Sequence, residues 1–359
     1  QLLDATPLLS KIMDRCPAVK LLVTSREPLQ LAAEWRLDIA GLSLPEEKAE
    51  PENGRYASAV ELFAQMAAQV RPGFALSAEH AAEIGDICRL LSGVPLAIKL
   101  AASWLRLMSV PQVIEEISRS LDFLASRMRD IPARQLSMRA VFSYTWDLLS
   151  ADEQRIFRGL SIFRGSFSAE AASSVLGATP YMLVTLVDKS LLQMESSGHE
   201  TRYLMHALTR QFGAEMLANA EAEAAMVATR HWHFFHDYLR NQYDALSGNQ
   251  RQEAVADISQ NIGNIRAAWR QIIAEKDAAG IGSITAVLYK FYFERSWFSE
   301  GIRLLTEAIN ALSGLPNQAE SEVQITLAWL EARRAGLVGG LGRFEEAAQR
   351  LHHCLETAR

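Results

Sequence analysis

The sequence lacks paired cysteines, a large charge excess and a long apolar run. Only three cysteines occur in 359 residues, and they lie far apart, which gives no disulfide framework and favours a reducing, cytoplasmic compartment. The most apolar stretch, residues 94–110, is interrupted by Lys99 and Arg106, so no membrane contact is expected. The net charge of −6 gives no electrostatic reason to expect nucleic acid as the main partner.

The composition predicts a globular and mostly α-helical chain. Hydrophobic residues make up 49% of the sequence, which is enough apolar surface for the cores of two or three domains. The chain opens at Gln1 and stops at Arg359 inside a helical pattern, so we expect a fragment of a longer protein.

Four segments follow from the pattern of apolar residues and breakers. Residues 1–50 predict a helix and then a buried parallel strand over 19–25, whose end would present polar groups to a ligand crevice. Residues 55–130 predict a small helical domain, in which Ser77 caps a helix and Pro95 opens the next one.

In residues 137–218 the pattern changes from helices alone to helices followed by short β-like runs. Helices over 138–149, 151–163, 168–176 and 180–190 precede two β-like runs, 191–195 and 202–205, and a closing helix follows. Helices followed by a small hairpin predict a winged helix.

Residues 221–359 predict only helices, arranged as an incomplete array of tetratricopeptide-like repeats in an α-solenoid. Phe298, Gly301, Leu305 and Ala308 recur as Phe344, Ala347, Leu351 and Cys354, an offset of 347 − 301 = 46 positions. Such repeats need neighbours to bury their faces.

Three short motifs are candidates for ligand contact. Arg26 follows the predicted strand, where its guanidinium fork would suit a phosphate, although taken alone a surface arginine explains it better. Gly93 can end one helix in a left-handed conformation and Pro95 can start the next, and on local grounds a plain helical corner explains them better than a ligand site. His206 heads a helix after a strand and is either an anion donor or a core histidine.

The order of these motifs resembles the later part of the nucleotide-binding module of STAND signal-transduction ATPases, the NB-ARC-type regulators. Residues 21–27 look like the strand that carries the sensor arginine, and Gly93-Val94-Pro95-Leu96-Ala97 looks like the Gly-Leu-Pro-Leu-Ala turn of that family. Met205-His206 looks like the start of its Met-His-Asp motif, and residues 142–149 and 160–165 resemble the opening of its winged helix.

The resemblance implies that residues 1–50 are the C-terminal remnant of an α/β nucleotide-binding core, and that Arg26, Pro95 and His206 contact ADP or ATP. Arg26 would face the phosphates, Pro95 the adenine or ribose, and His206 the β-phosphate of ADP in a resting state. Ala207 stands where the family often has Asp.

No Gly-x-x-x-x-Gly-Lys-[Ser/Thr] loop and no magnesium-binding acidic strand occur in the sequence. We therefore expect ADP or ATP with Mg²⁺ only in the full-length protein, with slow switching hydrolysis there. We expect neither tight nucleotide binding nor hydrolysis by this chain alone.

Other candidate metal and nucleic-acid sites are not supported by the spacing or the charge of their residues. His231, His233 and His236 do not share one helix face, so a metal site is not expected. The helix over 180–190 offers only Lys189 as a cation among apolar residues, which predicts a packing helix without direct nucleic-acid contact. The basic segment around Arg119 and Arg139 is better explained by solvation or domain contact than by DNA.

These observations predict a nucleotide-switched signalling regulator, with bacterial transcription as the output by analogy. A protein or small-molecule inducer would bind the repeats, and activation would bring self-association. The alternative is a tetratricopeptide-like protein-binding scaffold without a working nucleotide switch.

Overall fold

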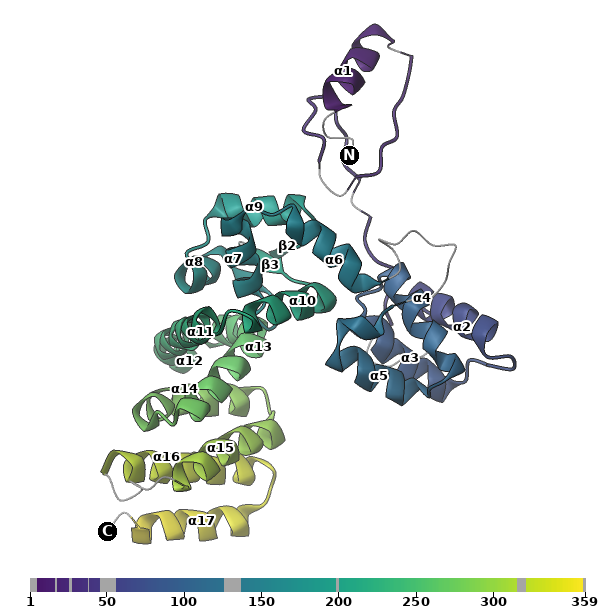
Figure 1. The fold of residues 1–359 in the computed structure, drawn as a ribbon. Coiled ribbons are helices and arrows are strands. Elements are labelled where there is room, and N and C mark those ends of the chain that lie inside the picture. The colour runs from purple at the N-terminus through teal and green to yellow at the C-terminus, as the bar shows by residue number, and fades with distance from the viewer. Residues whose placement is uncertain are drawn as a thin grey trace. The chain divides into compact units, whose positions relative to one another are not determined.

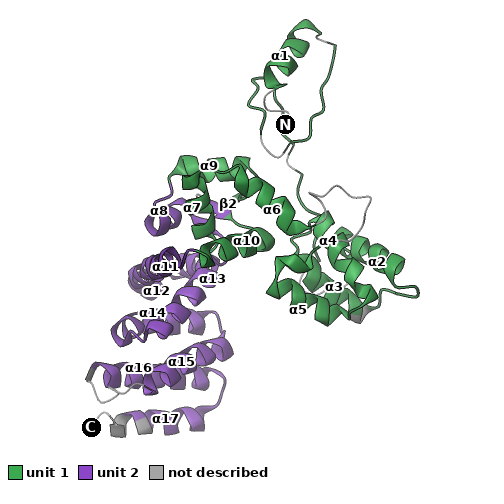
Figure 2. Ribbon diagram, viewed as in Figure 1, with its two compact units in different colours: residues 1–161, 179–195, 204–219 green, residues 162–178, 196–203, 220–359 purple. Residues whose placement is uncertain are grey.

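The computed structural model describes residues 5–16, 18–25, 28–37, 39–45, 56–125, 137–197, 200–314 and 321–357. The fold is mostly α-helical with one small sheet, as the sequence predicts (Figure 1). Two compact units are present: residues 1–161, 179–195 and 204–219 form the first, and residues 162–178, 196–203 and 220–359 form the second (Figure 2). Within the described ranges, none of the helices combines the length and apolarity needed to cross a membrane.

The N-terminal segment contains helix α1 (Thr6–Arg15), as predicted, but the expected strand over 19–25 does not form. A strand needs a neighbour for its backbone hydrogen bonds, and none is paired with this run among the described residues. Leu22, predicted to be buried, is 96% exposed.

Four helices and two short 3₁₀ turns form the helical part of the first unit. They are α2 (Ser58–Val70), α3 (Ala78–Leu90), α4 (Pro95–Ser103), η2 (Trp104–Arg106), α5 (Val110–Arg119) and η3 (Leu121–Phe123). Their apolar stripes meet in a core that includes Phe63, Ile84, Ile87 and Ile98.

The predicted helix starts in this part are confirmed. The Ser77 side chain accepts a hydrogen bond from the His80 backbone N–H at 3.2 Å, and Pro95 occupies the first turn of α4. The start of helix α2 is capped by a residue that lies outside the helix. Ser43 and Ser58 each donate a backbone N–H to the other's hydroxyl at 2.9 Å. Residues 41–45 therefore pack on this helical part.

The region from 137 to 219 has the element order expected for a winged helix. It contains α6 (Met138–Asp147), α7 (Ala151–Leu160), β1 (Phe167–Ser168), α8 (Ala169–Leu176), α9 (Pro180–Asp188), β2 (Gln193–Ser197), β3 (Glu200–Leu204) and α10 (Ala207–Ala218). The sheet order is β1-β3-β2, with Phe167 opposite Tyr203 and Ser168 opposite Arg202. Strand β1 is too short to be recognised in the sequence.

The second unit continues as a stack of helices (Figure 1). These are α11 (Glu221–Asn241), α12 (Tyr243–Ser247), α13 (Arg251–Glu275), α14 (Ala278–Glu294), α15 (Phe298–Ser313), α16 (Ser321–Gly340) and α17 (Phe344–Thr357). Helices α15 and α17 begin at Phe298 and Phe344, which confirms the offset of 46 positions read from the sequence.

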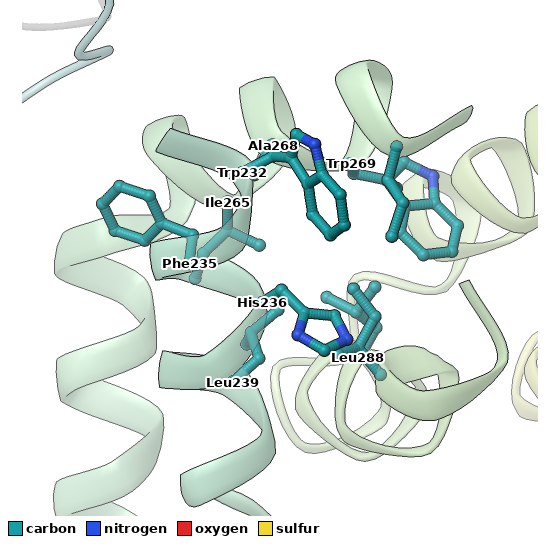
Figure 3. A pocket seen from close by; sticks show the side chains of 10 residues that line it. Trp232, Phe235, His236, Leu239, Ile265, Ala268, Trp269 and Leu288 are labelled. Carbon is teal, nitrogen blue, oxygen red and sulfur yellow. The ribbon is translucent and has the colours of Figure 1, made fainter. Parts of the chain in front are cut away.

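Large apolar side chains join α11, α13 and α14. Trp232, Phe235 and Leu239 of α11 face Ile265 and Trp269 of α13, with Leu288 of α14 beside them (Figure 3). These side chains line a small pocket, and all six are buried. This part of the second unit is therefore a packed apolar core.

Candidate functional site

The three predicted nucleotide contacts differ in how far the structure describes them. Arg26 lies outside the described residues. Pro95 and His206 are both described and both lie at the start of a helix, α4 and α10 respectively. Among the described residues, no hydrogen bond or ring contact joins Pro95 to His206.

The turn that precedes α4 is held by close backbone packing. Gly93 has a φ of +66°, and its carbonyl accepts a hydrogen bond from the Leu42 N–H at 2.9 Å. A Cβ atom on Gly93 would lie 2.4 Å from the Leu42 carbonyl oxygen. Both the positive φ and this approach require glycine, so the turn presents Pro95 in one fixed conformation.

Pro95 is exposed, and the helix behind it has no side-chain cap. Val94 at the N-cap position carries no hydrogen-bond acceptor in its side chain. The first N–H groups of a helix have no partner inside the helix, and they carry the positive end of its dipole. The first free N–H groups of α4, which follow Pro95, are therefore not capped by a side chain.

His206 lies at the start of α10, one position earlier relative to the helix than Pro95 is to α4. It is the N-cap residue, it is half-buried, and its side chain makes no capping hydrogen bond. Burial lowers the pKa of His206, and the nearby carboxylate of Glu195 opposes this only in part. A neutral imidazole at the start of a helix can donate one N–H to a phosphate oxygen.

A buried polar cluster in the second unit was missed by sequence reasoning. The Arg202 side chain is 5% exposed. Its guanidinium donates to the Ser166 hydroxyl at 3.0 Å and carbonyl at 3.1 Å, and to the Asn261 amide oxygen at 2.7 Å. These bonds tie strand β3 and the loop before β1 to helix α13.

Asn264 makes a second set of bonds to the same loop. Its amide oxygen accepts from the Arg164 backbone N–H at 2.6 Å, and its amide nitrogen donates to the Ser166 carbonyl at 3.0 Å. Between the two asparagines, a Cβ atom on Gly263 would lie 2.1 Å from the Arg164 carbonyl oxygen. We call Ser166, Arg202, Asn261, Gly263 and Asn264 the sheet–helix joint.

A sequence signal for this joint exists. Asn261 and Asn264 fall on the same stripe as Ile258, Ile265 and Trp269, which are all buried. Polar residues on an apolar stripe need buried partners. The pattern indicates buried amides but does not identify Arg202 as their partner, because that residue is 59 positions from Asn261.

The histidines of α11 have separate structural roles. His231 is 2% exposed and packs against Phe163 and Phe235, and its Nε2 has no hydrogen-bond partner. His236 accepts or donates at both nitrogens, to Asp237 at 3.0 Å and Ser283 at 2.7 Å. The described residues include no group of three His, Cys, Asp or Glu placed to hold a metal.

Helix α9 is only partly a packing helix. Leu183 and Leu186 are buried, whereas Tyr181 is 79% exposed and Val184 is 45% exposed. Its cation Lys189 is paired with Glu153 at 3.0 Å, with both side chains largely buried. This ion pair leaves Lys189 poorly placed to contact a DNA phosphate.

Two arginines of the predicted basic segment are also paired. Arg119 contacts Glu115 at 2.7 Å and Glu116 at 3.0 Å. Arg139 contacts Glu215 at 2.6 Å and is also paired with Asp122. The remaining arginines of that segment, at 127, 129 and 134, lie outside the described residues.

Comparisons with known proteins relate the chain to transcription regulators. No family model matches. The chain is 31% identical over 309 residues to a Mycobacterium tuberculosis protein named "Putative HTH-type transcriptional regulator", covering 84% of this chain and 33% of that protein. The chain thus spans about a third of the length of this relative. An "Uncharacterized protein" of the same organism is 30% identical over 240 residues, or 64% of this chain and 58% of that protein.

Among solved structures, the chain is similar to a Signal Transduction ATPase with Numerous Domains (STAND) protein from Pyrococcus horikoshii, which has a tetratricopeptide repeat sensor. The identity is 16% and the TM-score is 0.29, over 84% of this chain and 41% of that one.

Proposed function

We propose that this chain is the switching and sensing part of a nucleotide-dependent regulator of transcription. Helices α4 and α10 would bind opposite ends of an ADP molecule, and helices α11–α17 would carry the sensor surface. The main support is that Pro95 and His206, predicted from separate motifs, each begin a helix whose N-terminus has no side-chain cap.

The chemistry at the two helix starts suits a nucleoside diphosphate. His206 would donate its N–H to the β-phosphate, and the first amides of α10 would add positive dipole charge. Pro95 would pack against the base or ribose, because its ring is exposed and apolar. Arg26 would supply the third contact.

The relatives support the regulatory output. A 31% identical protein carries the name of an HTH-type transcriptional regulator. In this proposal, ADP holds a resting arrangement, and exchange for Mg²⁺-ATP, together with an inducer on the repeats, leads to self-association. The two states differ in the contacts that each nucleotide makes, as any ligand-driven switch requires.

Titration calorimetry of the intact gene product with ADP tests this function. We expect His206→Ala to weaken ADP binding about tenfold or more, the loss of one charge-assisted hydrogen bond. His233→Ala is the matched control, because His233 is exposed on α11 and outside the proposed site. Absence of ADP binding by the wild-type protein would favour the repeat scaffold without a nucleotide switch.

A further inference from the structure

Aromatic rings and cations gather on one surface of the second unit. Helix α12 contributes Tyr243, helix α14 contributes residues 289, 290 and 293, and helix α16 contributes residues 329 and 333. Ring and cation contacts connect neighbouring members of this set. We call the set the aromatic–cationic face: Tyr243, Tyr289, Lys290, Phe293, Trp329 and Arg333.

Arg333 contacts one ring of the face directly. Its guanidinium carbon is 4.9 Å from the centre of the Trp329 ring, and one of its N–H groups donates to the Trp329 carbonyl at 3.4 Å. Burial lowers the pKa of Arg333, while Tyr243 and Tyr289 raise it. The cation is thus partly removed from water, against Trp329 and near enough to the other two rings to interact electrostatically.

Lys290 has a similar environment. Its ammonium lies 3.9 Å from the centre of the Tyr243 ring and donates to the Ser247 hydroxyl. In the part of the chain that the structure describes, neither Lys290 nor Arg333 is paired with a carboxylate.

Two other arginines that contact these helices do have carboxylate partners. Arg334, the next residue after Arg333, pairs with Glu331 at 2.5 Å, and Arg251 of α13 pairs with Glu294 of α14 at 3.2 Å. Partial burial of a cation without an anion costs free energy. The face therefore has an excess of positive charge that a negatively charged ligand would neutralise.

The apolar groups of the face are open to solvent. Tyr243 is 42% exposed, Phe293 44% and Trp329 49%. Ile325, one helical turn before Trp329, is 56% exposed. Exposed aromatic residues beside an arginine are the residue types enriched where binding energy concentrates at protein interfaces.

Glycine allows two of the helices to approach at this surface. A Cβ atom on Gly336 of α16 would lie 2.8 Å from the Tyr289 hydroxyl of α14. Because Gly336 follows Arg333 by one turn, the Tyr289 hydroxyl is held beside the backbone of α16. The rings near the cation are therefore held in place before any ligand binds.

From these contacts we propose that the aromatic–cationic face binds an acidic peptide segment of a protein partner. Carboxylates of the peptide pair with the two cations, and its apolar side chains cover the exposed rings. The proposal names the residues and the class of ligand through which the repeats would act as a sensor. Its regulatory meaning rests on the proposed function.

A nucleic acid fits the face less well. Single-stranded nucleic acid stacks on aromatic rings but also needs a row of cations that follows its phosphates. This face offers two cations, and the whole chain has a net charge of −6. Exposed Ile325 further favours aliphatic and aromatic side chains over nucleobases.

Selection of short random peptides displayed on phage, against the immobilised chain, tests this proposal. Peptides rich in Asp and Glu with Phe, Leu or Trp should be enriched. An enriched peptide should bind Arg333→Gln and Lys290→Gln about tenfold more weakly than wild type, and added salt should weaken binding further. Arg303→Gln is the matched control, because Arg303 is exposed on α15 outside the face.

Four results would overturn the proposal. They are enrichment of neutral or basic peptides, no peptide preferring wild type over Arg333→Gln, oligothymidylate competing with the peptide, and a dimer in sedimentation that Arg333→Gln abolishes. Circular dichroism of each variant checks that the fold is retained. Neither ADP nor ATP is present in these measurements, so their failure is independent of the ADP calorimetry.

Discussion

Arg202 donates from its guanidinium to the amide oxygen of Asn261 at 2.7 Å, and this bond links strand β3 to helix α13. His206, the candidate phosphate contact, follows Arg202 by four residues along the chain, 206 − 202. Under the proposed function, a displacement of β3 on nucleotide exchange would act directly on α13, the helix to which this strand is bonded.

Replacement of Arg202 by Leu should destabilise the protein by about 3 kcal/mol. The change removes the donor to the buried amide oxygen of Asn261, while the Ser166 carbonyl keeps the bond from Asn264. Leaving a buried acceptor unpaired typically costs about 1–3 kcal/mol, and the packing of the Arg202 side chain is lost as well. Urea unfolding measures the difference. The control is Arg251→Leu, which removes a largely exposed ion pair and should cost less than about 1 kcal/mol. Equal effects of the two variants would contradict the role of the joint.

Gly263→Ala should be as damaging as a large core substitution. The added Cβ would lie 2.1 Å from the Arg164 carbonyl oxygen, so helix α13 must move away from the loop before β1. We expect a loss of about 2–4 kcal/mol in unfolding free energy. Gly339→Ala in α16 is the control. Its Cβ would meet only the Ala347 Cβ at 3.8 Å, and higher helix propensity should stabilise it slightly.

Acid should weaken the second unit through His231. Burial lowers the pKa of His231 to about 4, opposed by the Asn264 side chain and assisted by Arg164. The unfolded chain takes up a proton near the ordinary value of 6.5, while the folded chain does so only near pH 4. Stability is therefore fully present above pH 6.5 and falls as the pH drops toward 4, by about 3 kcal/mol in total.

Urea unfolding at pH 7 and pH 5 measures this effect. His231→Phe removes the titrating group but keeps a ring beside Phe163 and Phe235. Its stability should change less between the two pH values than that of the wild type. A variant with the same pH dependence as the wild type would rule out His231 as the source.

The sequence predicts the helices well and the polar contacts between them poorly. Proline at 95 and serine at 77 mark helix starts because capping and φ restriction are local properties. The start of α17 follows from that of α15, because a repeat preserves its spacing. The prediction of a strand over 19–25 was wrong because strand formation is not a local property. An apolar run becomes a strand only when another strand pairs with it.

At the candidate site, too, local conformation was predictable from the sequence and contacts between distant residues were not. Gly93 was predicted to adopt a left-handed conformation at the turn, and its φ of +66° confirms this. Its contact with Leu42 was not predictable, because those residues lie 51 positions apart, 93 − 42. The contacts of Arg202 and Arg333 depend on which helices pack together, which periodicity does not determine. The roles of Arg26, Pro95 and His206 toward a nucleotide stay predictions.

Hydrogen–deuterium exchange of the intact gene product, with and without ADP, tests the central claim most directly. If one nucleotide contacts both helix starts, ADP should slow exchange of the amides over 96–98 and over 207–209 together, and His206→Ala should remove both effects. Unchanged exchange at both helix starts on saturation with ADP, or slowing that persists in the His206→Ala variant, would contradict the account.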